Sequence, residues 1–431
     1  MNYPDSVHFL YALGNEIKTA KFGLERIQAV LAALGRPQDR CRFVHVAGTN
    51  GKGSVCAMVE SGLRAHGVRT GLFTSPHLAE PTERIRLDGR PIAHSRFTDA
   101  FNRVHACAEQ MLTAGTIDLH PTYFETVTAM AMLVFAEEQT GMVVLETGLG
   151  GRLDATNVVH PELCVITPVD FDHEAYLGRS LEAIAGEKAG ILKAGVPAVF
   201  AGQRPEAAAV LDARAALLGV PVRRTSEFAV DGLALSARGS SFQVNGLRIT
   251  CPLPGEHQVE NALTAVRALQ TLGVPPAAIE TGIARTRWPG RLELLAERPE
   301  TIVDGAHNPA GARALAAYIQ RFYAGRRVRL IFGAMRDKAI AEMAGILFPV
   351  AQQVIVTAPR QARALSPEAM REIIDHPDLT VVRDLEQALT LVRESRPGDV
   401  VFISGSLFLV AEARELLAPE KGQDDGHRFS Y

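Results

Sequence analysis

The chain has 431 residues, of which 47% are hydrophobic, so it can bury two or three ordinary domain cores. Its 45 basic and 48 acidic residues nearly cancel, which argues against a binding surface for nucleic acid or for a charged membrane. Five cysteines are scattered singly, a pattern that favours a reducing compartment over a disulfide framework. Because the N-terminus does not resemble a signal peptide and no apolar run has the length of a membrane span, we expect a cytoplasmic protein.

The chain begins with a segment of helical periodicity over residues 6–34, which Gly35 and Pro37 close. Its apolar stripe consists of Leu10, Leu13, Ile17, Leu24, Ile27, Val30, Leu31 and Leu34. An apolar run at 43–46 then predicts a buried strand, and residues 55–65 predict a helix.

The glycine-spaced loop GTNGKGS at 48–54 joins this strand to this helix. Such a turn directs backbone N–H groups and a helix N-terminus at an anion, with Lys52 adding charge for the outer phosphates and Ser54 a hydroxyl for magnesium. Gly53 stands where the usual P-loop has Ser or Thr, so a general NTPase assignment is too broad. The alternative is a turn that is glycine-rich only because it is tightly packed, although packing gives no reason for a lysine in its middle.

Further strands alternate with helical stretches, which predicts a parallel sheet with ligands at the carboxyl ends of its strands. We expect strands near 70–74, 142–145 and 163–166, a helical region interrupted at 113–122, and a helix at 257–272. Short alternating runs at 226–251 predict a small antiparallel addition, and a second α/β cycle supplies strands at 328–332, 354–357, 379–382 and 399–404. The predicted fold class is α/β, with a P-loop-type parallel sheet domain and a small β elaboration over residues 1–292 and a Rossmann-like domain over 293–431.

Polar side chains follow two apolar runs of the first domain. Glu146 comes directly after MVVL, and a carboxylate at a strand tip beside a phosphate loop is a natural magnesium ligand. Asp172 and His173 follow the next run, so two neighbouring strand tips are expected to bring Glu146 and His173 to one crevice. Histidine is a less typical ligand for a hard cation, and a packed or capping histidine is the alternative.

Three further positions carry weaker signals. Ser75 adds a hydroxyl at the same sheet edge, but Ser-Pro is also an ordinary turn. Lys188 is by default a surface lysine. Asp304 ends the first strand of the second domain and could face a nucleotide across an interdomain cleft, although an Asp followed by Gly also forms turns.

Many ordered motifs resemble those of the folylpolyglutamate synthases, including bacterial bifunctional dihydrofolate synthases, within the Mur ligase superfamily. They are GTNGKGS, TSPHL, ERIRLDGRPI, TYFET, ETGLGGRLDATN, FDHEAYLG, GEKAGILK, PGRLE, DGAHNP and FGAMRDK, and together they span nearly the whole chain. The run VDFDHEAYLG departs from the Gly-Leu-Asp-His version of many relatives, but Asp172 and His173 are retained.

The resemblance implies an assignment residue by residue. ATP is expected on Gly51, Lys52, Gly53, Ser54, Asn261, Arg291 and Asp304, and magnesium, as two ions, on a site with Ser75, Glu146 and His173. Lys188 matches a lysine that is carbamylated in the superfamily, and Lys52, His173 and Lys188 are the expected catalytic residues. The pterin substrate is expected on Thr122, Tyr123, Phe124, Glu125, Leu153, Asp154 and Ala155.

The implied reaction is ATP-dependent ligation of L-glutamate to dihydropteroate and to reduced folates through an acyl phosphate, by a monomer. Whether both synthase activities are present stays open at this stage. One alternative is a cell-wall Mur ligase, against which ERIRLDGRPI and TYFET argue. Another is a regulatory nucleotide switch, for which no guanine-reading Asn-Lys-x-Asp segment is found.

Overall fold

The computed structural model describes residues 1–13, 23–396 and 398–417. Packing divides the chain into two compact units. The first comprises Met1–Leu233, Ser241–Pro252 and Gln258–Thr286, and the second Ala234–Ser240, Leu253–His257 and Arg287–Tyr431. Packing says nothing about what each unit does. The assignment of residues 1–292 to an ATP-binding domain and of 293–431 to a ligase domain therefore stays a prediction. Ile17 of the predicted helical stripe lies outside the described residues.

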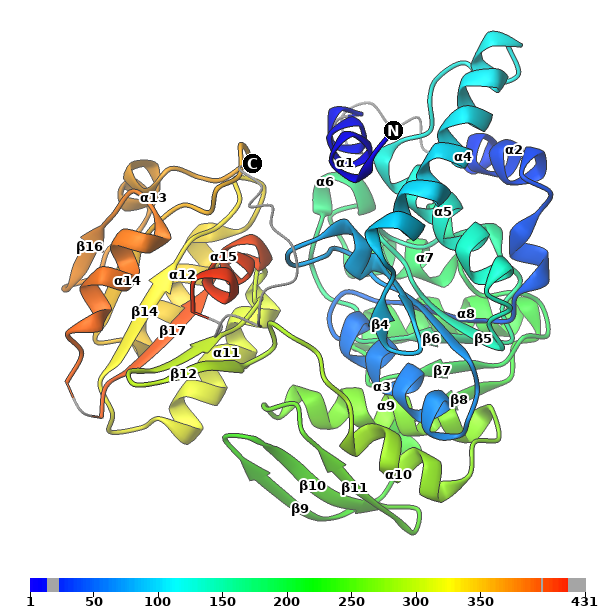
Figure 1. Cartoon of the computed structure of the whole chain (residues 1–431). Coiled ribbons are helices and arrows are strands. Elements are labelled where there is room, and N and C mark those ends of the chain that lie inside the picture. Colours follow the sequence, from blue (N-terminus) through cyan, green and yellow to red (C-terminus); the bar gives the residue numbers. More distant parts are fainter. Residues whose placement is uncertain (14–22, 397, 418–431) are drawn as a thin grey trace. The chain divides into compact units, whose positions relative to one another are not determined.

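An eight-stranded sheet forms the centre of the first unit (Figure 1), in the order β4-β3-β2-β5-β1-β6-β7-β8. The strands are β1 Phe43–Ala47, β2 Thr70–Phe73, β3 Ile85–Leu87, β4 Arg90–Pro91, β5 Met142–Glu146, β6 Leu163–Ile166, β7 Ala198–Phe200 and β8 Val222–Arg224. From β2 to β8 every neighbouring pair is parallel, which confirms the predicted parallel sheet. The expected adjacency of the two strand tips that carry Glu146 and His173 is wrong, because β1 lies between β5 and β6.

Helices cover both faces of this sheet. They are α1 Tyr3–Ala12, α2 Glu25–Ala33, α3 Lys52–Ala65, α4 His94–Thr113, α5 Tyr123–Glu137, α6 Glu174–Leu177, α7 Leu181–Ala189, α8 Pro205–Leu218, α9 His257–Thr271 and α10 Pro276–Ala284. One apolar core gathers side chains of α1, α2, α4 and α5, and another gathers those of α7 and α8. The predicted interruption at 113–122 is confirmed, since α4 ends at Thr113 and Thr122 caps α5.

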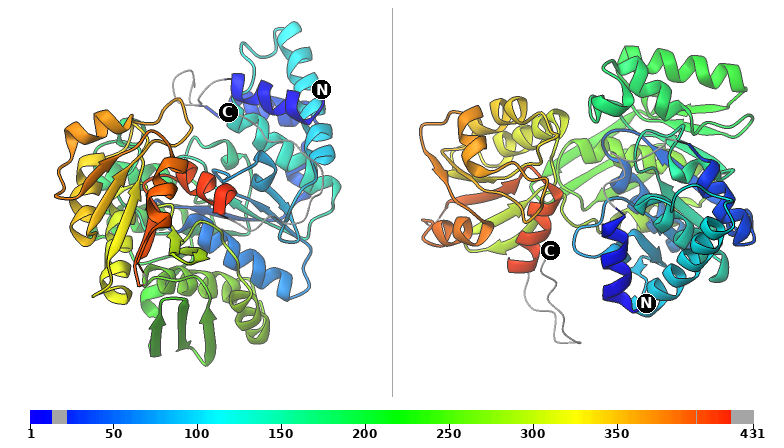
Figure 2. Two further views of the ribbon diagram at one scale, coloured as in Figure 1. Left: turned by 60° about the vertical axis from the view of Figure 1, so that its left-hand side comes forward. Right: turned by 90° about the horizontal axis from the view of Figure 1, so that it is seen from above.

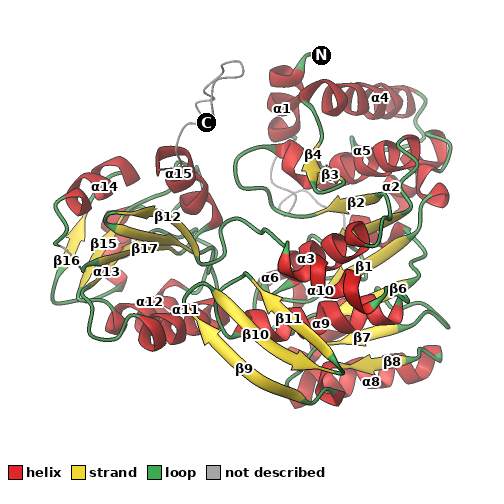
Figure 3. Cartoon of the chain, turned by 60° about the horizontal axis from the view of Figure 1, so that its bottom comes forward, coloured by secondary structure: helices red, strands yellow, loops and turns green. Residues whose placement is uncertain are grey.

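The predicted antiparallel addition is a three-stranded sheet of β9 Val230–Ser236, β10 Gly239–Val244 and β11 Leu247–Cys251 (Figure 3). Only two residues separate consecutive strands, a length that joins antiparallel neighbours. The second turn is Asn245-Gly246, with positive φ at both residues, as a hairpin turn of this length requires.

The second unit contains a six-stranded sheet in the order β12-β13-β17-β14-β15-β16, in which only β12 is antiparallel to its neighbour. Its strands are β12 Glu293–Glu297, β13 Glu300–Val303, β14 Val328–Phe332, β15 Gln353–Val356, β16 Leu379–Val381 and β17 Val400–Ser404. Its helices are α11 Pro309–Phe322, α12 Ile340–Leu347, α13 Pro367–Ile373, α14 Leu385–Arg393 and α15 Leu407–Leu417. Helices α11 and α12 lie on one face of the sheet and α14 and α15 on the other (Figure 3), which confirms the predicted Rossmann-like arrangement.

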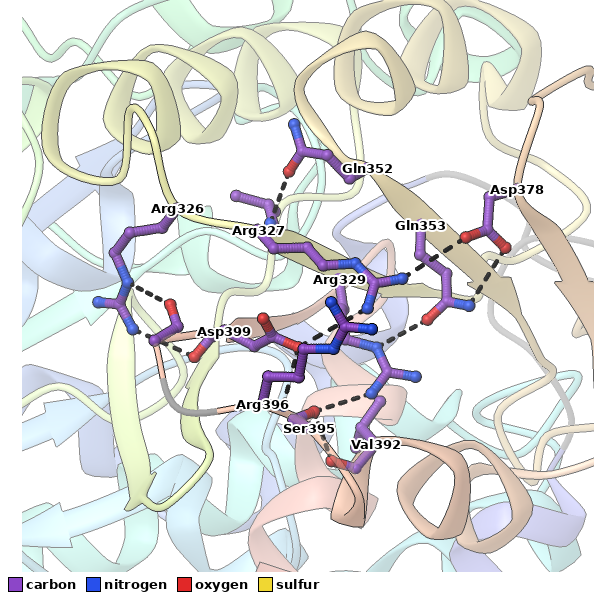
Figure 4. A network of polar contacts seen from close by, with 12 residues as sticks. Arg326, Arg327, Arg329, Gln352, Gln353, Asp378, Val392, Ser395, Arg396 and Asp399 are labelled. Atoms are coloured by element: carbon purple, nitrogen blue, oxygen red, sulfur yellow. Dashed lines mark hydrogen bonds and ion pairs between the residues drawn. The ribbon is translucent and has the colours of Figure 1, made fainter.

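A polar network supports this second sheet (Figure 4). Arg329, on β14, is buried and donates to Gln353 Oε1 at 2.7 Å, to Ser395 Oγ at 2.8 Å and to the Leu391 carbonyl at 3.1 Å. These bonds satisfy a buried guanidinium, which would otherwise be costly. They tie β14 to β15, to α14 and to the segment that follows α14.

All five cysteines are free thiols, in keeping with the sequence prediction. Among the described residues, no helix combines the length and the apolar character needed to cross a lipid bilayer.

Candidate functional site

The phosphate loop begins at the end of β1, in the middle of the first sheet. Gly48 and Gly51 adopt positive φ values of 148° and 86°, and Gly51 is the residue immediately before α3. The helix therefore starts at Lys52, three residues earlier than the predicted 55, because Gly51 provides the left-handed turn that ends the loop. A helix of 14 residues thus presents its free N–H groups beside the carboxyl end of β1, where an anion is stabilised.

Asn261 on α9 packs directly against Gly51. A Cβ atom on Gly51 would lie 2.2 Å from Asn261 Oδ1, so any other residue there would have to displace the Asn261 side chain. Asn261 donates to Gln258 Oε1 at 2.9 Å, and Gln258 Nε2 donates to Ser54 Oγ at 3.3 Å. The structure therefore brings together three predicted ATP-site residues, and Gln258 is a positioning residue that the sequence did not reveal, since a glutamine on a helix carries no distinguishing pattern.

Two lysines converge on one carbonyl of this loop. Lys52 Nζ donates to the carbonyls of Gly48 and Thr49, each at 3.1 Å. Lys188 Nζ, from α7, donates to the Gly48 carbonyl at 2.7 Å. The default assignment of Lys188 to the surface is wrong, because only 4% of it is exposed.

The environment of Lys188 favours its neutral form. Burial, together with the charge of Lys52, lowers its pKa from 10.5 to about 7, against the opposing effect of Asp172 and Asp154. A large fraction of the Lys188 side chains is then an uncharged amine at neutral pH, which can act as a nucleophile.

Glu146 and Ser75 lie together at the ends of β5 and β2, on the side of β1 that faces away from β6. Glu146 ends β5, lies beside Val46 of β1, and is 4% exposed. Its Oε2 accepts a hydrogen bond of 3.0 Å from the backbone N–H of Ser75, which follows β2, the next strand. Two of the three predicted magnesium ligands therefore lie together, and both offer the oxygen atoms that magnesium prefers.

His173 holds an unusual backbone conformation, with φ of 53°, at the start of α6. Its backbone N–H donates to Asp172 Oδ1 at 2.9 Å, and its Nε2 lies 3.8 Å from the same oxygen. The alternative of a capping histidine fits the position but not the side chain, which makes no capping hydrogen bond to α6. A left-handed conformation in a residue other than glycine is a strain that is often found at functional sites. That His173 shares a metal with Glu146 remains a prediction.

The predicted substrate segment 122–125 forms the capped start of α5. Thr122 Oγ1 accepts from the Glu125 N–H at 3.2 Å, and Glu125 Oε2 accepts from the Thr122 N–H at 2.8 Å, a reciprocal capping box. Glu125 also pairs with Arg26 at 2.8 Å, and the Tyr123 ring stacks on Tyr11 with centroids 5.8 Å apart. Thr122 and Glu125 thus fix the backbone of this segment.

The second predicted substrate segment, 153–155, lies in a loop that its own aspartate organises. Asp154 accepts from the backbone N–H groups of Leu149 at 2.7 Å and Thr156 at 3.0 Å, and burial raises its pKa. Leu153 is half-buried and Ala155 is buried. The loop touches α5, because a Cβ on Gly148 would lie 2.5 Å from the Phe124 ring, so the structure brings the two segments together.

A buried histidine near the segment 122–125, His77, was not predicted as a site residue. His77 Nδ1 accepts from Arg84 Nε at 2.9 Å, which leaves the Nε2 proton facing the Tyr11 hydroxyl at 3.1 Å. The Arg84 guanidinium lies 5.0 Å from the centre of the Tyr123 ring. The sequence signal was the TSPHL motif, but only the fold shows that His77 lies near Tyr123.

The second unit holds two of the predicted ATP-contacting residues. Asp304 is 7% exposed and accepts from the N–H groups of Leu292 and Ala306, both at 2.9 Å. Burial raises its pKa and the nearby Arg291 opposes that shift. The bonds fit the alternative of a turn-stabilising aspartate, and contact of Arg291 and Asp304 with a nucleotide stays a prediction.

Comparison with known protein families gives two matches. Residues 46–269 match the Mur ligase middle domain, and residues 290–407 match the glutamate ligase domain of Mur ligases. The chain is 36% identical to the dihydrofolate synthase/folylpolyglutamate synthase of Bacillus subtilis over 415 residues, which cover 92% of this chain and 95% of that protein. The enzyme of the same name from Escherichia coli is 33% identical, over 93% of this chain and 92% of its own length.

Solved structures show the same similarity. Folylpolyglutamate synthase of Mycobacterium tuberculosis, complexed with ADP and AMPPCP, matches with a TM-score of 0.90 and 33% identity, over 99% of this chain and all of that one. FolC of E. coli, in complex with DHPP and ADP, matches with a TM-score of 0.85 and 31% identity, over 96% of this chain and 97% of that one.

Proposed function

The chain belongs to the Mur ligase family and, within it, to the folylpolyglutamate synthases, and from this premise we propose that it ligates L-glutamate to dihydropteroate and to the γ-carboxylate of reduced folates. It is an ATP-dependent ligase. The observation that carries the proposal is that Lys52 and Lys188 both donate to the Gly48 carbonyl, in the loop that leads into the 14-residue helix α3.

Ligation requires a carboxylate to become a better electrophile. Attack of the substrate carboxylate on the γ-phosphate of ATP gives an acyl phosphate and ADP, and the glutamate amine then displaces phosphate to give the amide. Both first reactants are anions, so their approach needs positive charge. Lys52 and the N–H groups at the start of α3 supply it next to the loop, which is the role that we assign to them.

Magnesium fits the side chains at the carboxyl ends of β2 and β5. Ser75 and Glu146 provide oxygen donors that are already held together, and we assign them, with His173, to magnesium. Magnesium, when bound, neutralises phosphate charge and orients the transferred group. We propose two such ions.

Lys188 is proposed to become a carbamate. Its neutral amine would attack CO₂ to form an N–C bond, one electron pair of a C=O bond would move to oxygen, and the nitrogen would release a proton to solvent. The product would be an anion in place of a buried amine, and its two oxygen atoms would suit a magnesium ion. The lowered pKa of Lys188 supports this step, because only the uncharged amine reacts.

For the pterin we propose a site at residues 122–125 and 153–155. The capping box of Thr122 and Glu125 and the bonds of Asp154 support it by holding both segments rigid without any ligand. Tyr123 and Phe124 are themselves buried, with 7% and 8% of their surface exposed, so their rings mainly pack the core beside this segment. A monomer and a cytoplasmic location remain predictions.

One experiment tests the reaction and its two substrates. The protein is incubated with ATP, magnesium and L-glutamate, with dihydropteroate in one tube and tetrahydrofolate in another, and products are identified by mass spectrometry. We expect a gain of one glutamate in the first tube and of one or more in the second, together with ADP. Product in only one tube would restrict the enzyme to that activity, and product in neither would refute the ligase assignment for these substrates.

Three further tests examine the ATP site and the two alternative functions. Lys52→Ala is expected to abolish both products while the protein keeps its circular dichroism spectrum, and ligation at near wild-type rate would refute the ATP site. A regulatory switch would release phosphate from ATP without glutamate or a pterin, whereas the ligase needs both. A cell-wall Mur ligase would accept a nucleotide-linked precursor in place of the pterins.

A further inference from the structure

Two histidines and a glutamate meet between α4 and the segment before α5. His105 and Glu109 lie one helical turn apart on α4, so their side chains share a face of that helix. His120 comes from the connection that follows the end of α4 at Thr113. One donor atom from each of the three residues lies within 4.8 Å of the others.

The spacing of the two imidazoles matches a shared metal ion. A hydrogen bond of 3.3 Å joins His105 Nδ1 and His120 Nε2, and a metal ion would take the place of its proton. Two nitrogens that each bind one tetrahedral zinc ion at about 2.0–2.1 Å are about 3.3 Å apart, so the two rings would need to move little to bind the ion. Glu109 Oε1 lies 3.9 Å from His105 Nδ1, and its side chain, 54% exposed, can move in to complete the set.

The orientation of His120 is that of a metal ligand. Its Nδ1 lies 2.8 Å from the Pro121 carbonyl, an acceptor only, so Nδ1 carries the proton and donates it. The neutral ring then directs the lone pair of Nε2 toward His105. Metal-binding histidines usually donate their second ring N–H in this way, which fixes both the tautomer and the ring.

Aromatic rings hold the two imidazoles in place. The Phe101 ring is stacked on His105, with centroids 5.5 Å apart and planes 9° apart. The ring of Phe9, on α1, packs against both histidines, with its centroid 4.5 Å from that of His105 and 5.4 Å from that of His120. In both views of Figure 2, α1 (dark blue) lies beside α4 (cyan), so three segments of the chain surround the cluster. Such an apolar wall limits ring rotation and the access of water.

We propose that His105, Glu109 and His120 form a binding site for a divalent transition metal of the zinc type, with water as the fourth ligand, which ties α4 to the segment that leads into α5. Two imidazoles and one carboxylate suit zinc in preference to magnesium, which takes mostly oxygen ligands. The site uses no residue assigned above to ATP, magnesium or the pterin. It therefore does not depend on the proposed function.

Cobalt titration tests the site, because tetrahedral Co²⁺ absorbs visible light far more strongly than octahedral Co²⁺. Untagged full-length protein is freed of metal with a chelator, saturated with magnesium and AMPPCP, and titrated with Co²⁺ and then with Zn²⁺. We expect one equivalent of tetrahedral Co²⁺, displaced by Zn²⁺, and a melting temperature that rises with Zn²⁺. Absence of a tetrahedral spectrum in the wild type would overturn the proposal.

Three variants and one control assign the ligands. His105→Gln and His120→Gln should each weaken Co²⁺ binding by more than about 100-fold, since even the loss of an outer hydrogen-bond partner can cost 10–100-fold. His160→Gln, which changes an exposed histidine outside the cluster, should leave binding unchanged. If a histidine variant fails to fold, Glu109→Gln decides, because it alters an exposed side chain and should still weaken binding by more than about tenfold. An unchanged affinity in Glu109→Gln and in every folded histidine variant would place the Co²⁺ elsewhere and overturn the proposal.

Discussion

Lys52 and Lys188, which are 136 residues apart in the chain, donate to the same oxygen atom, the Gly48 carbonyl, at 3.1 and 2.7 Å. Burial makes the charge of Lys188 costly, and repulsion from the ammonium group of Lys52 at the same acceptor adds to that cost. The easiest relief is loss of the proton from the more buried lysine. Burial and the nearby Lys52 thus make available, at neutral pH, the neutral form of Lys188 that reaction with CO₂ requires.

Carbamate formation on Lys188 can be detected directly. In ¹³C-labelled bicarbonate, we expect one carbamate resonance in the NMR spectrum of the wild-type protein. Lys188→Arg should lack it, because a guanidinium does not form this carbamate at neutral pH. Lys193→Arg is the matched control, since burial also lowers the pKa of Lys193 but that side chain bonds Asn157 instead. A resonance that survives Lys188→Arg would refute the assignment.

The lowered pKa of Lys188 also predicts how stability depends on pH. Between its folded value of about 7 and its ordinary value of 10.5, the unfolded chain binds one more proton than the folded chain. Stability attributable to this group therefore rises with pH over that window, and below pH 7 the penalty for the buried charge is present in full.

Urea unfolding of the wild type and of Lys188→Met, in CO₂-free buffers from pH 6 to pH 10, measures this effect. The free energy of unfolding of the wild type minus that of Lys188→Met should increase from pH 7 upward, by on the order of 4 kcal/mol at pH 10 if the whole shift is realised. A difference that stays constant with pH would show that Lys188 has an ordinary pKa.

Gly51 should be intolerant of any side chain for two reasons that a control can separate. Its φ of 86° disfavours other residues, and a Cβ would lie 2.2 Å from Asn261 Oδ1. Gly67 has the same backbone conformation, with φ of 83°, but no described atom lies within 4 Å of its Cβ position. Both Gly51→Ala and Gly67→Ala should lose about 1–2 kcal/mol of stability from the backbone.

Only Gly51→Ala should also disturb the ATP site, because it displaces Asn261. Its dissociation constant for AMPPCP, measured by calorimetry, should rise by more than about tenfold, which corresponds to about 1.4 kcal/mol. Gly67→Ala should bind AMPPCP like the wild type. Equal affinities in the two variants would mean that the contact between Gly51 and Asn261 does not matter for the nucleotide.

Local patterns were sufficient to predict much of the fold. The apolar runs of β1, β5, β6, β14 and β17 are buried strands, as predicted. The loop before α3 was also predicted, although the helix begins at Lys52 and not at 55. The order β5-β1-β6 could not be predicted, since pairing between strands depends on contacts distant in sequence. For the same reason the burial of Lys188 and the stacking of Tyr11 on Tyr123 appear only in the folded chain.

Glu146→Gln tests the magnesium site with little change of shape. The amide oxygen of glutamine can still accept from the Ser75 N–H, so the ends of β2 and β5 should stay together, but the negative charge is lost. The magnesium concentration for half-maximal ligation should rise by about tenfold or more, because a carboxylate is the stronger ligand for this cation. Glu60→Gln is the matched control: Glu60 is equally buried, but it binds Thr70 Oγ1 at 2.6 Å and Arg64 Nε at 3.0 Å. Glu60→Gln should lower the melting temperature and leave the magnesium dependence unchanged, whereas a magnesium dependence of Glu146→Gln equal to that of the wild type would remove Glu146 from the site.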